Sequence, residues 1–186
     1  MSYFSLKQIP KNLIFLCIFI FLTQNIYAKT LVEKANAYYE KGLYSKAHKL
    51  FKQSAKKGNI DAEYSLGVMY EGGMGVDTNM SQALKWYTKA AKKGHLNAQY
   101  NVASLYYKGR GTEQEYEKAR YWYLEAAKNG DTQALYNLGV MFLKAEGVTR
   151  NKLKAYELWR EAAKIGNPQA EDSLDLLCKE SPWVCR

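Results

Sequence analysis

The amino-acid sequence predicts an all-α fold, an α-solenoid of stacked antiparallel helix pairs with about four repeats and a C-terminal cap. Three observations carry this prediction. Four glycines recur at a constant interval of 36 residues, namely Gly58, Gly94, Gly130 and Gly166. The apolar residues within each interval fall into two runs with helical spacing. A glycine-containing loop separates the two runs, as a tight reversal between antiparallel helices requires.

The constant period divides the middle of the chain into three units that align without a gap. These units are residues 59–94, 95–130 and 131–166. In the first unit, apolar residues recur at helical spacing from Ala62 to Tyr70 and again from Ala83 to Ala91. One helix pair cannot bury its apolar face alone, whereas three or more stacked pairs can. The period therefore predicts a stack of pairs.

A two-residue joint connects consecutive units. Glycine just past the end of a helix adopts a left-handed conformation that other residues adopt only with strain. The residue after each glycine begins the next unit, and these residues are Asn59, His95, Asp131 and Asn167. Asparagine and aspartate are favoured N-caps, and His95 occupies the same place. Pro168 then stands at a first helical position, where its missing N–H leaves no hydrogen bond unmade.

Residues 1–28 have the features of a secretory signal peptide. Lys7 and Lys11 lie before a short apolar run at residues 13–22, and Ala28 supplies a small residue at the exit. We expect cleavage after Ala28, which makes the mature protein periplasmic or secreted. The run is shorter than the roughly 20 apolar residues of a membrane span, so no stable membrane insertion is expected after cleavage. An uncleaved anchor is the alternative.

The chain is basic, with a formal charge of +9 that falls by two when the signal-peptide lysines are removed. The basic residues are spread along the sequence, and the pairs Lys56–Lys57 and Lys92–Lys93 fall at helix ends, where cations complement the helix dipole. This local role is preferred to a binding patch. Because no nucleic-acid-binding motif is present, no nucleic acid is expected as a partner.

Two cysteines, Cys178 and Cys185, remain in the mature chain. An even, closely spaced pair in an exported protein predicts one disulfide. Pro182 lies between them and ends the last helix, so the bridge would tie a short tail back onto that helix. Two thiols without a nearby histidine make half of a metal site, and their spacing is not that of a redox motif. No metal and no cofactor are expected.

The motifs of the aligned units resemble a known repeat. The pattern A-x-Y-x-L-G-x-x-Y, then G-x-G-V, then A-L-x-W-Y-x-K-A-A-x-x-G is similar to the Sel-one-like repeat (SLR), a relative of the tetratricopeptide repeat. The resemblance covers residues 59–166 in full. Residues 29–58 resemble a degenerate, tetratricopeptide-like first repeat. Residues 167–186 begin another unit and then depart from it, as a capping helix with a disulfide-closed tail would.

No catalytic residue is predicted. His48 and His95 lack a neighbouring metal-binding or carboxylate motif, and no serine lies in a hydrolase motif. Some exported, cysteine-rich members of the family carry a β-lactamase label, and those have a cysteine pair in nearly every repeat. This chain has one pair near its end, so a β-lactamase-like enzyme is the disfavoured reading and a non-enzymatic protein is preferred.

The resemblance implies that the first helix of each pair lines a concave face. Side chains there would form a ladder of aromatic, amide and hydroxyl groups that grips a protein partner. The predicted partner-binding residues are Tyr64, Ser65, Tyr100, Asn101, Ser104, Tyr107, Tyr136 and Asn137. Packing is an equally weighted role for the tyrosines, because aromatic residues of cores and of binding faces look alike in sequence.

The resemblance also implies a function. Short exported members of the family include immunity proteins that neutralise toxic enzymes delivered into the periplasm, notably lipid-cleaving ones. The leading hypothesis is an exported protein-binding module of this immunity type, with a toxic effector as its partner. A periplasmic scaffold or adaptor that binds cell-envelope proteins is the alternative.

Overall fold

The computed structural model describes residues 11–185, with side chains at residues 23, 26 and 27 and from residue 29 onward. The apolar core of the predicted signal peptide lies outside the described side chains. Helices make up the ordered elements of the described part. They are α1 (Lys11–Glu40), α2 (Tyr44–Ala55), α3 (Ile60–Gly72), α4 (Met80–Lys92), α5 (Leu96–Lys108), α6 (Tyr116–Lys128), α7 (Thr132–Lys144), α8 (Lys152–Lys164), α9 (Pro168–Glu180) and the short 3₁₀-helix η1 (Pro182–Cys185).

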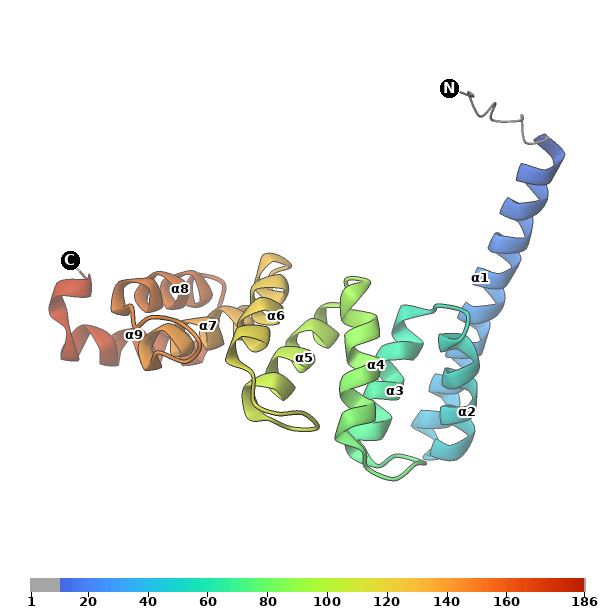
Figure 1. The fold of residues 1–186 in the computed structure, drawn as a ribbon, viewed down its shortest axis with the longest axis horizontal. Coiled ribbons are helices and arrows are strands. Elements are labelled where there is room, and N and C mark those ends of the chain that lie inside the picture. The colour runs from blue at the N-terminus through green and yellow to red at the C-terminus, as the bar shows by residue number, and fades with distance from the viewer. Residues whose placement is uncertain (1–10, 186) are drawn as a thin grey trace, which may run out of the picture.

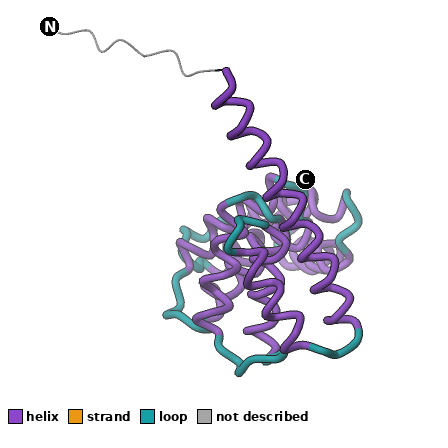
Figure 2. Tube along the Cα trace, turned by 90° about the vertical axis from the view of Figure 1, so that its right-hand side faces the viewer, coloured by secondary structure: helices purple, strands orange, loops and turns teal. Residues whose placement is uncertain are grey.

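The helices pack as consecutive antiparallel pairs, and the pairs stack into an elongated solenoid (Figure 1). Each odd-numbered helix is the first helix of a pair, and each even-numbered helix is the second. Extensive packing joins α1 to α2, α3 to α4, α5 to α6 and α7 to α8, and the second helix of each pair also packs on the first helix of the next. Figure 2 shows helices and connecting loops along the described chain, with no strand among them. The predicted fold class is confirmed.

Every joint between units has the predicted construction. Each of the four joint glycines has φ between 85° and 90°, which is the left-handed region that favours glycine. The next residue caps the following helix through its side chain, and Asn59, Asp131 and Asn167 do this with an amide or carboxylate oxygen. His95 does the same with Nδ1, which accepts a hydrogen bond from the N–H of Ala98 at 3.2 Å.

The loop inside each unit also begins with a left-handed residue. Gly73 and Gly109 fill this position with φ of 67° and 64°. In the unit 131–166 the position belongs to Ala145, with φ of 62°. An alanine in this region is strained by roughly 1–2 kcal/mol relative to a right-handed conformation. The glycine pattern of the sequence did not identify Ala145.

A row of aromatic side chains lies between the two helices of every pair. We call Phe51, Tyr87, Tyr123 and Trp159 the seam residues, because each occupies the same register on a second helix and is buried. They face small residues on the first helices. A Cβ added to Gly67 would collide with the Tyr87 ring, and one added to Gly139 would collide with the Trp159 indole. The small residue therefore makes room for the aromatic ring.

The C-terminal cap packs on the last helix pair of the stack. A disulfide joins Cys178 to Cys185 across a Cα–Cα distance of 5.7 Å, so the predicted bridge is confirmed. It holds η1 against α8 and α9, where Val184 and Leu177 are buried. The Lys152 ammonium donates a hydrogen bond of 2.7 Å to the Ser181 hydroxyl and fixes the tail to α8.

Candidate functional site

The predicted partner-binding residues all lie on the first helices α3, α5 and α7. We call the surface that α1, α3, α5, α7 and α9 share the first-helix face. All eight predicted side chains are half-buried, so they are anchored in the stack and still reach solvent. Rigid, half-exposed aromatic and amide groups are suited to recognising a protein surface.

Three predicted tyrosines each pack on a seam residue of their own unit. The ring-centroid distances are 5.6 Å for Tyr64 with Tyr87, 5.7 Å for Tyr100 with Tyr123, and 6.1 Å for Tyr136 with Trp159. These contacts restrict the tyrosine side chains to one orientation. The tyrosines therefore contribute to packing and also present a ring edge on the first-helix face.

The Tyr87 hydroxyl is a polar centre near the N-terminal half of the face. It donates a hydrogen bond of 2.8 Å to Glu71, and the side chain of Asn101 bonds to the same hydroxyl. Burial of the ring and the hydrogen bond to Glu71 raise the pKa of Tyr87 well above its ordinary value. The guanidinium of Arg110 lies 3.5 Å from Glu71 and balances its charge.

A second polar centre surrounds Tyr123 in the next unit. Ser104 and Asn137, from two different first helices, bond to the Tyr123 hydroxyl. The Asn137 amide also donates to the Tyr100 hydroxyl at 3.4 Å. Burial raises the pKa of Tyr123 above its ordinary value, so the hydroxyl stays neutral over the physiological range. The amide of Asn137 thus links α7 to α5 across the face.

A third contact extends this network towards the C-terminus. The Tyr107 hydroxyl donates a hydrogen bond of 2.7 Å to Glu146, which lies in the inner loop of the following unit. Burial makes the largest contribution to raising the pKa of Tyr107, and the hydrogen bond to Glu146 raises it further. Sequence reasoning did not identify Tyr87, Tyr123, Arg110 or Glu146 as parts of the face. The period places Tyr87 and Tyr123 at equivalent positions, but the direction of their hydroxyl groups follows from the packing.

Two apolar grooves lie on the first-helix face, one towards each end of the solenoid. The N-terminal groove has a volume of about 250 Å³ and lies between α1 and α3. It is lined by Asn36, Tyr39, Phe51, Tyr64, Ser65 and Val68. The C-terminal groove has a volume of about 200 Å³ and lies between α7 and α9. Its lining includes Tyr136, Val140, Leu143, Trp159, Ser173 and Leu176.

The two grooves have the same construction. In each, a seam residue forms the floor, with Phe51 at one end and Trp159 at the other. First-helix side chains of two consecutive pairs form the walls. Tyr87 on α4 and Tyr123 on α6 come between the two grooves in the order of the helices, and so does the hydrogen-bonded network around them. The face therefore offers two apolar recesses separated by fixed polar groups.

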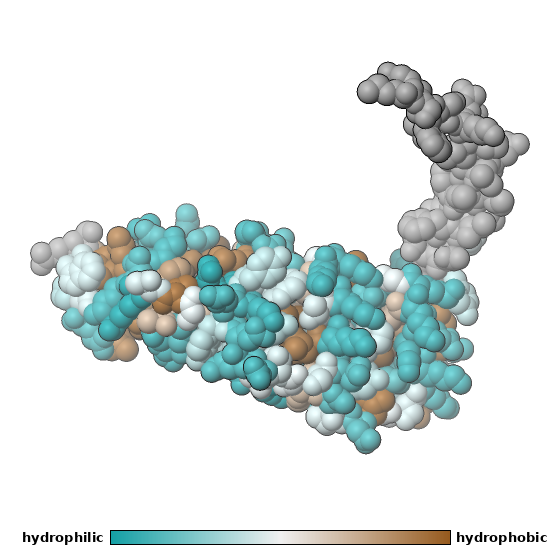
Figure 3. Space-filling model, in the orientation of Figure 1, coloured by the Kyte–Doolittle hydropathy of each residue, from teal (hydrophilic) through white to brown (hydrophobic). Residues whose placement is uncertain are grey.

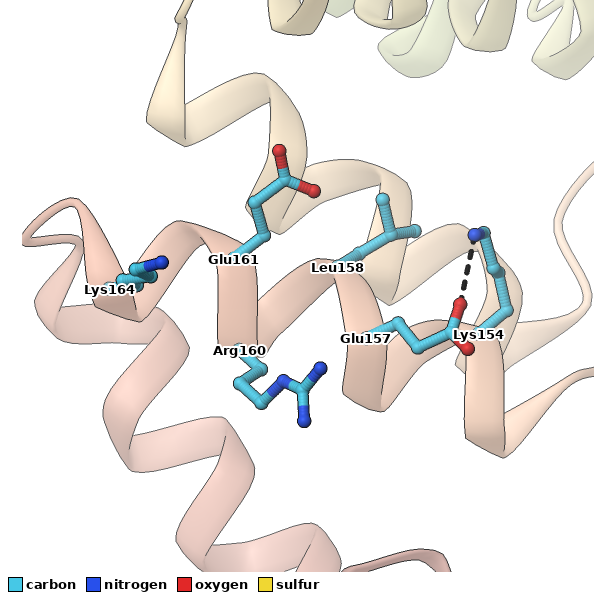
Figure 4. Close-up of a pocket in the computed structure, with 6 residues that line it drawn as sticks. All are labelled: Lys154, Glu157, Leu158, Arg160, Glu161 and Lys164. Carbon is cyan, nitrogen blue, oxygen red and sulfur yellow. Dashed lines mark hydrogen bonds and ion pairs between the residues drawn. The ribbon is translucent and has the colours of Figure 1, made fainter.

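Other candidate sites are less developed. An open hollow of about 690 Å³ follows α8 and is lined by that helix alone, from Lys154 to Lys164, with no convergent polar groups from a second element (Figure 4). Among residues 11–185, wherever side chains are described, no three histidine, cysteine or carboxylate groups gather as a metal site would require. Within the same part of the chain, no helix has the length and apolarity to cross a membrane.

Solved structures similar to this chain are bacterial repeat proteins. A protective antigen of uropathogenic Escherichia coli that displays an SLR fold is 30% identical, with a TM-score of 0.79 over 82% of this chain and 34% of the antigen. A Sel1 repeat protein from Oxalobacter formigenes is 30% identical, with a TM-score of 0.72 over 83% of this chain and 62% of that protein. Helicobacter pylori cysteine rich protein B, 20% identical with a TM-score of 0.52, shares the fold over 68% of this chain and 96% of its own.

The chain thus spans less than two thirds of the first two relatives. No curated protein matches it. The family model for the Sel1 repeat matches four consecutive segments, residues 35–59, 60–95, 96–131 and 132–167. The last three segments begin with α3, α5 and α7, the first begins within α1, and together they cover most of the chain. With its period, helix pairs and joints, the chain belongs to the Sel1 repeat family.

Proposed function

We propose that this protein is a non-catalytic binding module that holds a protein partner on its first-helix face. The observation that carries the proposal is the pair of apolar grooves with a fixed polar network between them. Apolar recesses accept the aromatic or aliphatic anchors that dominate protein interfaces, and fixed hydroxyl, amide and carboxylate groups set the register of the partner.

The rigidity of the face supports binding over catalysis. The hydroxyl groups of Tyr87, Tyr107 and Tyr123 have raised pKa values and remain neutral hydrogen-bonding groups. They are not poised to exchange protons near neutral pH. Because their partners hold them in place before binding, little side-chain entropy is lost when a partner docks.

The disulfide supports an oxidising compartment outside the cytoplasm. Within that location we propose the finer role of an immunity protein that neutralises a toxic, lipid-cleaving effector acting in the periplasm. A scaffold that gathers cell-envelope proteins would use the same face. The two roles differ in the number of partners, so an experiment that counts partners separates them.

Photo-crosslinking tests the proposal directly. A photoreactive phenylalanine analogue would replace Val68 or Ser173, which line the two grooves, in the native organism. Matched controls carry it at Thr88 and Leu124 on the second helices. We expect one dominant protein adduct from the groove positions and none of that adduct from the controls. Several envelope proteins would favour the scaffold, and equal adducts from both faces would contradict a first-helix site.

A protection assay tests the immunity role. Bacteria that produce an effector encoded beside this protein, directed to the periplasm, should survive when the wild-type chain is present. Asn101→Ala should weaken protection, whereas Lys128→Gln on α6 should not. Absence of protection would overturn the immunity role, and hydrolysis of a chromogenic β-lactam by the purified protein would overturn the non-catalytic assignment.

A further inference from the structure

The second helices carry an uneven distribution of charge along the solenoid. We call their solvent-exposed surface the outer face. Residues 44–57, which contain α2, and residues 80–93, which contain α4, include no aspartate or glutamate. They include nine lysines, namely Lys46, Lys49, Lys52, Lys56, Lys57, Lys85, Lys89, Lys92 and Lys93. We call this part of the outer face the lysine surface.

The basic stripe of α4 is not repeated on α6 and α8, where two of the three equivalent positions are not basic. On α4, Lys85, Lys89 and Lys92 are exposed and share one stripe of the helix, opposite its buried alanines. The same register on α6 is Tyr121, Glu125 and Lys128, and on α8 it is Glu157, Glu161 and Lys164. The basic character is therefore a property of one end of the solenoid and is not a consequence of the repeat.

Most lysines of the lysine surface have no carboxylate to neutralise them. Among the described residues, Lys93 alone of the nine forms an ion pair, at 2.7 Å from Glu63. In the C-terminal half, by contrast, Lys128 pairs with Glu125. Lys154 pairs with Glu157, as Figure 4 shows. Like charges repel, so a surface that keeps eight unneutralised ammonium groups together is suited to an anionic partner.

The structure places α2 and α4 on the same side of the stack, since in Figure 1 α4 lies in front of α3 and α2 lies in front of the lower part of α1. The Lys93 ammonium donates a hydrogen bond of 3.2 Å to the carbonyl of Gly58, which follows Lys57. The backbone around Tyr44, at the start of α2, approaches Gly75 in the loop before α4. Figure 3 shows hydrophilic side chains spread over this region. Lysines that sequence reasoning assigned to helix ends thus join into one surface.

We propose that the lysine surface docks on a membrane that contains anionic phospholipids. The lysines are spread over the exposed sides of two helices and do not surround one cavity, which matches a planar array of headgroups better than a single ligand. Each lysine near an anionic membrane surface contributes to attraction, and the contributions add. Long lysine stems reach headgroups while aromatic residues pack at the interface.

Aromatic residues of the lysine surface support an interfacial location. The Lys89 ammonium lies 4.0 Å from the centroid of the half-buried Trp86 ring. Tyr44 and Leu43 are exposed at the start of α2. Tryptophan and tyrosine favour the boundary between headgroups and water. Because the second helices lie across the stack from the first-helix face, a docked solenoid keeps both grooves accessible to a protein partner.

Vesicle flotation tests this proposal. The chain, with the N-terminus that it carries after export in a bacterial host, would be mixed with vesicles of phosphatidylcholine alone or of phosphatidylcholine with phosphatidylglycerol. The test variant carries Lys49→Gln, Lys56→Gln, Lys85→Gln and Lys92→Gln. The matched control carries Lys128→Gln, Lys154→Gln, Lys164→Gln and Lys179→Gln, which removes the same charge from exposed positions of the C-terminal half. Circular dichroism would verify that both variants keep the helical content of the wild type.

We expect the wild type to bind anionic vesicles, with binding that weakens as salt rises. The test variant should bind them at least tenfold more weakly, while the control stays within about twofold of the wild type. An equal loss in both variants would overturn the proposal, because net charge alone would then explain binding. Binding to short double-stranded DNA but not to anionic vesicles, or binding to neither, would also overturn it.

Discussion

The seam and the first-helix face use aromatic residues at neighbouring positions of the same repeat, yet they follow the 36-residue period to different degrees. The seam keeps one kind of residue in all four pairs, a buried aromatic ring, and small residues such as Gly67 and Gly139 face it. The first-helix face changes from unit to unit, and Ser104, for example, stands where Val68 and Val140 stand. Burial demands a constant shape, whereas a half-exposed position can change its chemistry without disturbing the stack.

The largest effect on stability is expected from a substitution at a buried core position. Trp122 is 9% exposed and belongs to the main apolar cluster. We expect Trp122→Ala to lower the free energy of unfolding by about 3–5 kcal/mol, because a large buried ring is removed and a cavity remains. Urea unfolding followed by circular dichroism measures this. A loss below about 1 kcal/mol would show that buried and half-exposed positions are energetically alike.

Gly139→Ala tests the space opposite a seam residue. The new methyl group would collide with the Trp159 indole, which donates a hydrogen bond of 3.0 Å to the carbonyl of Tyr136. We expect a destabilisation of about 1–3 kcal/mol from this overpacking. Ala103 occupies the equivalent position opposite Tyr123 and is a natural control. Trp159→Tyr combined with Gly139→Ala should recover much of the loss, and a failure to do so would contradict the steric explanation.

A polar position on the first-helix face should matter less for stability. Asn101→Ala removes one hydrogen bond to the Tyr87 hydroxyl, which keeps its bond to Glu71. We expect a loss of about 0.5–1.5 kcal/mol in unfolding free energy. Partner binding should fall by a larger factor than stability alone explains. If Asn101→Ala unfolds the protein as readily as Trp122→Ala, the distinction between buried core positions and the first-helix face does not hold.

Ala145→Gly should stabilise the protein. The alanine has φ of 62°, where Gly73 and Gly109 stand in the other complete units. Relief of this strain outweighs the entropy that glycine adds to the unfolded chain, so we expect a gain of about 0.5–1 kcal/mol in unfolding free energy. The reverse substitution, Gly109→Ala, is the control and should destabilise. Equal melting temperatures for Ala145→Gly and the wild type would contradict the expected strain.

The smallest effect should appear as a pH dependence at one joint. Burial lowers the pKa of His95. The carboxylate of Asp61, with an oxygen 3.9 Å from Nε2, opposes this shift. Nδ1 must stay unprotonated to accept the hydrogen bond from the N–H of Ala98. Since the folded pKa lies below the unfolded value of about 6.5, the His95 contribution is complete above that pH and is lost as the pH falls through the folded pKa.

His95→Asn provides the matching measurement. Asparagine keeps the cap, as Asn59 and Asn167 do at other joints. Melting temperatures recorded from pH 7.5 to pH 5 should fall less for His95→Asn than for the wild type. The remaining slope includes His48, whose pKa is also lowered by burial. Identical slopes for the two proteins would exclude His95 as a source of pH dependence.

The sequence predicted the stack well because its signals are local. A glycine followed by a cap determines where one unit ends, and helical spacing determines which residues are buried. The disulfide followed from the one close cysteine pair of the sequence, Cys178 and Cys185. The eight ladder residues were correctly placed on first helices, and their role in binding stays a prediction.

Side-chain contacts and shared surfaces between different units could not be predicted from the sequence. Glu146 accepts a hydrogen bond from Tyr107, which lies 39 positions away in the sequence, and no local motif predicts this hydrogen bond. The lysine surface was likewise hidden, because Lys57 and Lys93 each look like an ordinary helix end. Their shared surface exists only after two second helices are laid side by side.

The length of the two-residue joint determines how the units are oriented relative to one another. A residue added between Gly94 and His95 would lengthen the joint, so α5 and every later helix would lose the orientation relative to α4 that the left-handed glycine and the extended cap residue now set. The local caps would survive, but α3 and α5 would no longer present their side chains to the same side. The constant length of the joint therefore keeps all units in the same relative orientation, and a surface that extends over several units depends on that constant length.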